Sequence, residues 1–165
     1  MKSVPQLVSA LVMAAALTLG GCSPGDAEET DIVPGQSAEI PGGDFSSTDE
    51  LGDFLLDSID AVHVHRESES NPDFNHETDV DRLHVEFPSQ GQPNTDKKAT
   101  ADAVQAAGSA TFDYDVLMVT GTTDTGTWSY VYSIDTVEEV TGIGSVVEAD
   151  TVWDFADQDF DSVHR

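Results

Sequence analysis

Four of the five histidines in the chain lie in one short stretch, and neutral imidazole is a common ligand of transition metals. His63 and His65 alternate with valines, and Glu86 follows two residues after His84. We consider two antiparallel strands paired with His65 opposite His84. His63 then lies opposite Glu86, and all four side chains share one sheet face. Such a set suits zinc, copper or nickel, whereas the alternative is an ordinary polar face in contact with solvent.

The segment between these histidines offers oxygen ligands at alternate positions, namely Asp73, Asn75, Glu77 and Asp79. Calcium takes six to eight such oxygens, and a turn can direct them toward one ion. The spacing is similar to the start of an EF-hand loop. It departs from that pattern because Thr78 stands where the loop needs glycine, and no bidentate glutamate follows at the twelfth position. A solvated acidic loop is the alternative to this calcium hypothesis.

Cys22 is the only cysteine of the chain, and it follows Leu19-Gly20-Gly21 at the end of an apolar segment that begins at Leu7. That segment is shorter than the roughly 20 residues that a membrane-spanning helix needs. Together with Lys2, it resembles the signal peptide and lipobox of bacterial lipoproteins. The resemblance implies that the Cys22 sulfur receives a diacylglycerol and that residues 1–21 are removed. An ordinary secretory peptide with a free thiol, or a short buried anchor, is the alternative.

The resemblance also implies a location and a kind of partner. Acyl chains such as palmitate would hold the protein on the extracytoplasmic face of the cell membrane, or on an outer membrane if the host has two. Each buried methylene contributes about 0.8 kcal/mol, so two or three chains hold the protein stably. We expect a secreted binding or accessory module of the cell envelope whose partner is an unidentified envelope protein or ligand. A lipoprotein that binds zinc, copper or calcium is the alternative.

Motifs that would indicate catalysis are absent from the sequence: it has no nucleophile elbow, no His-Glu-x-x-His motif, no phosphate-binding glycine loop and no pair of thiols. Carboxylates are so abundant that choosing two of them as an acid and a base carries no information without a cleft. We therefore expect no enzymatic activity and no cofactor beyond the metal ion considered above. A hydrolase of the cell envelope is the alternative, and it would need a concave pocket lined by convergent polar groups.

The charge of the chain excludes one class of partner. It has 32 Asp and Glu against 6 Lys and Arg, a formal net charge of −26. Loss of residues 1–21 would remove Lys2 and no acidic residue, which makes the charge −27. Nucleic-acid binding depends on Lys and Arg to displace counterions, so we exclude it. Repulsion from anionic lipid leaves membrane attachment to the acyl chains, and self-repulsion favours a monomer, although salt adaptation also explains such acidity.

Composition divides the chain into three parts. Residues 22–47 mix proline, glycine and small polar residues without periodicity, which predicts a lipidated, disordered tether that spans roughly 25 to 30 Å. Residues 48–165 then remain for one domain with a single core. Within that domain, residues 154–161 are too acidic to be core, and we expect a flexible acidic tail at this end of the chain.

The elements that must position the histidines follow from periodicity. Ser47-Thr48-Asp49-Glu50 fits a capping box, and apolar residues at three- and four-residue steps predict a helix over 48–60. Alternation then predicts strands around 62–65 and 83–87, unless the helix continues through His65. Further elements are expected as an Ala-rich helix over 96–108, a hairpin of strands 112–120 and 128–134, a helical turn over 135–141 and a last strand over 147–155.

These elements predict an α+β domain: a single small antiparallel-rich sheet with two helices on one face, preceded by the disordered tether. Alternate residues of a strand point to opposite faces of the sheet. The aromatic residues of the hairpin lie at positions that face one side, and the histidines lie at positions of their own strands that face the other side. We therefore expect Trp128, Tyr130 and Trp153 to be largely buried under the helices, while His63 and His84 are not.

Overall fold

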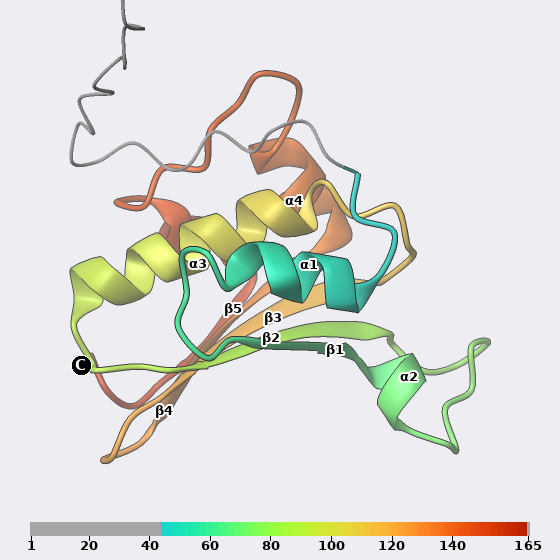
Figure 1. The fold of residues 1–165 in the computed structure, drawn as a ribbon, viewed down its shortest axis with the longest axis horizontal. Coiled ribbons are helices and arrows are strands. Elements are labelled where there is room, and N and C mark those ends of the chain that lie inside the picture. Colours follow the sequence, from blue (N-terminus) through green and yellow to red (C-terminus); the bar gives the residue numbers. More distant parts are fainter. Residues whose placement is uncertain (1–43, 165) are drawn as a thin grey trace, which may run out of the picture. The chain divides into compact units, whose positions relative to one another are not determined.

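Five strands form one sheet, and helices cover one of its two faces (Figure 1). The computed structural model describes residues 44–164. The strands are β1 (His63–Arg66), β2 (Arg82–Pro88), β3 (Val116–Thr122), β4 (Thr127–Ser133) and β5 (Gln158–Asp161), in this order across the sheet. The helices are α1 (Thr48–Leu55), α2 (Glu67–Ser70), α3 (Pro93–Ala107) and α4 (Ile134–Val140), with one 3₁₀ turn, η1 (Val152–Phe155). The fold is therefore α+β, as the sequence predicts.

The signal peptide predicted at 1–21, the lipidation site at Cys22 and the tether up to residue 43 lie outside the described residues. At its other end, the predicted tether overlaps the fold. Phe45 is buried and forms an isolated parallel bridge with Ala110, and its amide donates to the carbonyl of Ser109 at 3.0 Å. The residues just before position 47 therefore belong to the domain. Within residues 44–164, none of the helices is long and apolar enough to cross a membrane.

Strand pairing confirms that the sheet is antiparallel-rich. The pairs β1–β2, β3–β4 and β4–β5 are antiparallel, and β2–β3 is parallel. A parallel pair needs a crossover connection, which α3 supplies between β2 and β3. Figure 1 shows α1, α3 and α4 on the same face of the sheet. Two of these are the predicted helices, and α4 is the short helical turn predicted at 135–141.

α1 begins where the capping box predicts. The Ser47 hydroxyl accepts a hydrogen bond from the Glu50 amide, and the Glu50 carboxylate accepts one from the Ser46 amide at 2.7 Å. The helix ends at Leu55, earlier than the predicted residue 60. Ala61 has a φ of +53°, a left-handed conformation that a continuing helix cannot contain. The chain therefore turns and enters β1, and the alternative of a helix through His65 is wrong.

α3 is the Ala-rich helix, and it packs closely on its neighbours. It begins at Pro93, which suits the first helical position because proline has no amide hydrogen to leave unsatisfied. Ala99, Ala103, Val104 and Ala107 are all buried, as the predicted stripe requires. Small side chains at these buried positions let α3 pack close to the elements that it contacts.

The hairpin of β3 and β4 supplies the centre of the core. Tyr130 and Tyr132 lie opposite Val119 and Leu117, and all four are buried. Trp128 is fully buried opposite Gly121. A Cβ atom at Gly121 would overlap the Trp128 indole ring, so the missing side chain is the space that the indole fills. Burying this indole removes a large apolar surface from water and fixes the hairpin against the helices.

Residues 147–155 do not form the last strand, and this prediction is wrong. Val147 and Val152 are buried singly, and Val152 begins the 3₁₀ turn η1. The two valines therefore contact the core at separate places and do not belong to an alternating strand. The fifth strand is β5, which lies in the acidic segment that we expected to form the tail. It is an edge strand with mostly exposed side chains, and acidic residues are tolerated there because they remain hydrated.

The expected division between buried aromatic residues and exposed histidines is confirmed with one exception. Trp128 and Tyr130 are buried, His63 is exposed and His84 is half-buried. Trp153 is half-buried, because one face of its ring stacks on Tyr130 at a centroid distance of 4.6 Å while the Lys97 ammonium lies 5.3 Å from the ring centroid. Its position on η1, outside the sheet, leaves it partly accessible.

We predict opposite effects for two glycine substitutions. Gly121→Ala should lower the free energy of unfolding by about 1 to 3 kcal/mol, because the added methyl group displaces the Trp128 indole. Gly52→Ala in α1 should raise it by about 0.5 to 1 kcal/mol, because its Cβ meets Val64 at 3.6 Å, an ordinary contact, and alanine favours the helix. Urea unfolding followed by tryptophan fluorescence measures both values. Equal effects of the two variants would contradict this account of the core.

Candidate functional site

The sheet face opposite the helices carries the predicted metal ligands. In the antiparallel pair of β1 and β2, His63 lies opposite Glu86 and His65 lies opposite His84. This is the register on which the sequence hypothesis depends. The intervening residue Val85 is fully buried on the helix side, so the alternation of the strand directs the histidines to the open side.

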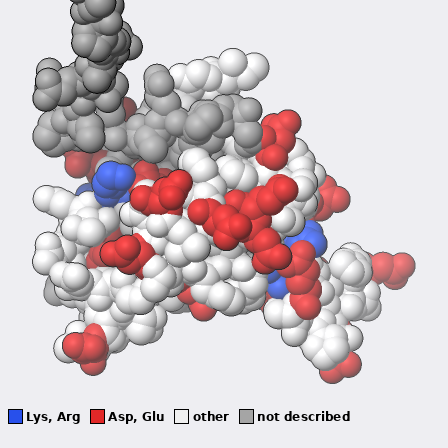
Figure 2. Space-filling view, in the orientation of Figure 1, with Lys and Arg blue, Asp and Glu red and all other residues white. Residues whose placement is uncertain are grey.

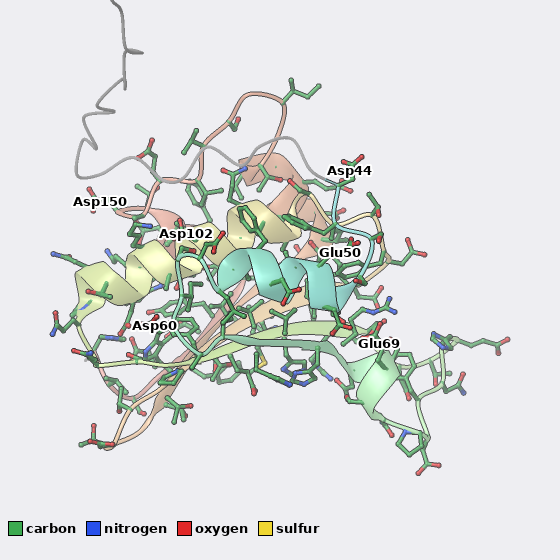
Figure 3. All side chains as sticks on the ribbon, in the orientation of Figure 1. Asp44, Glu50, Asp60, Glu69, Asp102 and Asp150 are labelled. Atoms are coloured by element: carbon green, nitrogen blue, oxygen red, sulfur yellow. The ribbon has the colours of Figure 1, made fainter. Side chains whose placement is uncertain are left out.

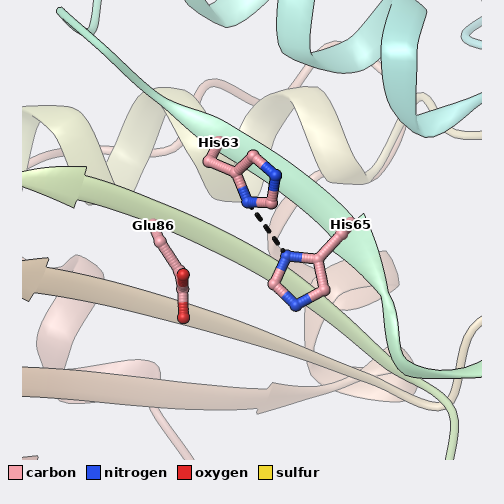
Figure 4. A group of neighbouring side chains, drawn as sticks. All are labelled: His63, His65 and Glu86. Atoms are coloured by element: carbon pink, nitrogen blue, oxygen red, sulfur yellow. Dashed lines mark hydrogen bonds between the residues drawn. The ribbon is translucent and has the colours of Figure 1, made fainter. Parts of the chain in front are cut away.

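His63, His65 and Glu86 converge (Figure 4). The Nδ1 atoms of His63 and His65 are 3.2 Å apart, and one ligand atom from each of the three residues lies within 4.8 Å of the other two. In a tetrahedral site with Zn–N bonds of about 2.0 to 2.1 Å, two nitrogen ligands lie about 3.3 Å apart. The two imidazoles therefore already have the separation that one ion requires. An ion between them would replace the proton that the two nitrogens share.

His84 lies beside this group and is not part of it. Its ring stacks on that of His65, with centroids 4.7 Å apart and an interplanar angle of 5°. Burial lowers the pKa of His84, and the neighbouring His65 lowers it further, while Glu86 and Glu67 oppose the shift. Both causes favour the neutral ring, which is the form that binds a metal. Three of the four predicted ligands thus converge, and the fourth is adjacent.

The predicted calcium ligands are not brought together. Asn75 accepts a hydrogen bond from the Glu77 amide through Oδ1, and Asp79 accepts one from the Asn75 amide through Oδ2, both at 3.0 Å. These oxygens therefore stabilise the turns of the loop itself. In the described part of the chain, the histidine–glutamate group is the one set of three His, Cys, Asp or Glu side chains whose ligand atoms converge. Asp73, Glu77 and Asp79 do not form such a set.

A second group of ionisable side chains, around His164, was missed by the sequence analysis. His164 Nε2 lies 2.9 Å from Oδ2 of Asp96, and Nδ1 lies 3.0 Å from Oδ2 of Asp161. The side chain of His164 is only 5% exposed, and those of Asp96 and Asp161 are 2% and 7% exposed. With a proton on each nitrogen, the imidazole donates to a carboxylate on either side. We call Asp96, His164 and Asp161 the C-terminal clamp, because they fasten the end of β5 to α3.

Hydrogen bonds around the C-terminal clamp determine what it can do chemically. The Ser89 hydroxyl donates to Asp96 at 2.7 Å, and the Trp128 indole donates to Ser89 at 3.3 Å. Both His164 nitrogens face carboxylates, so neither is free to accept the Ser89 proton as a catalytic base would. This arrangement stabilises the fold rather than activating a nucleophile. His164 and Asp96 are 68 residues apart, so no local pattern in the sequence indicates the clamp.

A shallow cavity of about 250 Å³ opens beside the C-terminal clamp, where Ser89 and Asp96 form part of its lining. The other polar groups at its wall include Lys98 and Asp102, which form an ion pair at 2.7 Å. Ser89 is thus bonded to Asp96, and Lys98 to Asp102. The alternative of an envelope hydrolase would need a serine bonded to a histidine or an equivalent pair, and these four residues do not provide one.

Comparisons of the chain with protein-family models, with curated proteins and with solved structures gave no match. A function for this protein must therefore be argued from the chemistry of its own residues.

We predict that the C-terminal clamp makes stability depend on pH through Asp161. Although burial raises the pKa of Asp161, the amides of His164 and Val163 and the His164 ring together hold it below its ordinary value. A lowered folded pKa contributes stability that is present above the unfolded pKa of about 3.9 and is lost as the pH falls through the folded value. Asp161→Asn should therefore cost about 1 to 2 kcal/mol at pH 6, and this cost should shrink below pH 4.

Urea unfolding of both proteins at a series of pH values measures this difference. The exposed Asp154 provides the control, since Asp154→Asn should leave the free energy of unfolding close to wild type throughout. A cost of Asp161→Asn that stays constant from pH 6 to pH 3 would show that the carboxylate charge contributes nothing.

Proposed function

We propose that this protein is a lipid-anchored, extracytoplasmic binding module that holds a divalent transition-metal ion on the open face of its sheet. The convergence of His63, His65 and Glu86 supports the choice of ligand. The lipobox-like run that ends at Cys22 supports the choice of location. A binding or accessory module for an unidentified envelope protein is the broader form of this proposal, and the metal ion makes it specific.

The three ligands suit zinc or copper better than calcium. Two imidazole nitrogens and one carboxylate oxygen form a borderline set, whereas calcium takes oxygen ligands almost exclusively. Three protein ligands leave one tetrahedral position for water or for a ligand from a partner. Since His63 is exposed on an edge strand, an ion there exchanges with solvent easily. Such a site fits uptake or delivery of a metal better than permanent structural binding.

The charge of the domain supports a cationic ligand. Figure 2 shows several groups of acidic side chains on the visible face and few basic ones. Three of the four basic residues between positions 44 and 164 form ion pairs: Arg66 with Glu69, Arg82 with Glu67 and Lys98 with Asp102. Figure 3 labels six acidic side chains, which come from α1, α2, α3 and connecting segments. The resulting negative potential raises the local concentration of cations and repels anionic lipid.

We predict that the mature chain binds one equivalent of zinc or of Cu(II) with micromolar affinity. A soluble form that starts at residue 23 is suitable, because it retains every core residue of the described domain. Calorimetric titration with zinc, copper and calcium should show heat for the first two metals. His65→Asn should weaken binding by a factor of ten or more, because it removes one ligand.

His76 provides the matched control, since it is an exposed histidine in the loop before β2 and lies outside the converging group. His76→Asn should bind zinc as the wild type does. Injections of zinc and copper without heat would contradict the metal site. Heat with calcium alone would favour the oxygen ligands of the loop instead.

We predict that the native protein partitions into the detergent phase on extraction, because acyl chains at Cys22 remain in lipid. Cys22→Ala should yield a chain that keeps residues 1–21 or that is released, whereas Ser23→Ala should be processed normally. Mass spectrometry of the native protein should find the first 21 residues absent and a diacylglycerol on Cys22. A native chain that is recovered in the aqueous phase would contradict the anchor.

A further inference from the structure

The imidazole of His84 stacks on that of His65, and this geometry separates the two rings in function. Their centroids are 4.7 Å apart, and their planes differ by only 5°. The lone pair of an imidazole nitrogen lies in the plane of its ring, so two nearly parallel stacked rings cannot both direct a lone pair to one ion. Nδ1 of His65 lies 3.2 Å from Nδ1 of His63 (Figure 4). His84 therefore contacts a candidate ligand but does not share its ion.

The two stacked residues differ in how firmly the sheet holds them. His65 belongs to β1, a strand of four residues at the edge of the sheet. His84 belongs to β2, which pairs with β1 on one side and with β3 on the other, so His84 lies between His65 and Met118. It is half-buried, whereas His63 on the edge strand is exposed. The stack therefore joins a candidate ligand at the edge of the sheet to a residue of an inner strand.

Stacking restricts the His65 ring without occupying the atoms that bind a metal. The contact is made through the flat face of the ring, and stacked aromatic pairs attract each other in this arrangement. The nitrogens in the ring plane therefore stay available to an ion. A side chain that is free before binding must lose its rotational freedom when the ion binds, which lowers affinity by about two- to tenfold. A ring that is already held in place avoids most of this loss.

We propose that His84 is a positioning residue of the metal site, which holds the His65 imidazole in the orientation that faces His63 and does not bind the ion itself. The proposal rests on the function proposed above, since that function makes His65 a ligand. It assigns different roles to the three histidines of the open face: His63 and His65 bind, and His84 supports. Position 84 then needs a flat aromatic ring but no ring nitrogen.

Variants of position 84 distinguish a supporting ring from a ligand, when the form that starts at residue 23 competes for zinc with a chromogenic chelator. His84→Phe keeps a flat ring without a nitrogen, so its zinc affinity should stay within twofold of wild type. His84→Ala removes the ring and should bind zinc about two- to tenfold more weakly. His84→Leu should resemble His84→Ala, and it keeps the test open if the alanine variant does not fold.

Val131→Ala is the matched control for removing a half-buried side chain from this face. Val131 lies on β4 opposite Met118, and its neighbours Tyr130 and Tyr132 are buried on the helix side. Its zinc affinity should equal that of the wild type.

Carbon relaxation of the His65 ring in the metal-free domain measures the restriction directly, on the picosecond to nanosecond timescale. The ring should be ordered in the wild type and in His84→Phe, and more mobile in His84→Ala and His84→Leu. Weak zinc binding by His84→Phe as well as by His84→Ala would show that His84 is a ligand and would overturn the proposal. Wild-type affinity in His84→Ala would also overturn it and would leave the group of His63, His65 and Glu86 intact. A wild-type domain that binds no zinc would overturn both this proposal and the zinc site of the proposed function.

Discussion

The two-residue period of the strands is the constraint on which the rest of this structure depends. Helices cover one face, and that face must hold Val85, Val119, Trp128 and Tyr130, because their burial stabilises the domain. Every residue between them is then directed to the other face. The arrangement of histidines on the open side is therefore a consequence of core packing. A slip of one residue in β2 would bury Glu86 and expose Val85, so the core itself maintains the geometry of the candidate site.

Sequence reasoning succeeded where the pattern was local and failed where it was not. The alternation of apolar and polar residues indicates which face of β1 and β2 carries the histidines, and the capping box at Ser47 locates the start of α1. Alternation does not determine the register, and the pairing of His65 with His84 was one of several that the sequence allowed. The parallel pairing of β2 with β3 leaves no comparable trace, because a crossover hides which residues meet. The position of Met118 opposite His84 could therefore not be predicted from the sequence. The last strand was misplaced because single buried valines resemble alternation, while β5 is too acidic to suggest a strand.

The two groups of ionisable residues illustrate how burial changes the role of the same side chains. His63 and Glu86 are exposed, so their lone pairs are available to an ion from solvent. His164 and Asp96 are almost wholly buried, and each is satisfied by the other and by Ser89 or Asp161. A buried carboxylate without such partners would be costly, which explains why the C-terminal clamp is bonded so completely. Histidine and carboxylate side chains are thus suited to bind a ligand where they are exposed, and they stabilise the fold where they are buried.

The separation of 68 residues between His164 and Asp96 also has an entropic consequence. Pairing β1 with β2 closes only the connection over residues 67–81, so it loses less chain entropy than the clamp does. Asp96 belongs to α3, whereas its imidazole partner lies near the other end of the described chain. The clamp therefore closes a much longer stretch of chain than the pairing of β1 with β2, and the entropy that this closure costs is larger. The buried hydrogen bonds of His164 must offset that cost for the end of the chain to stay docked on the helix start.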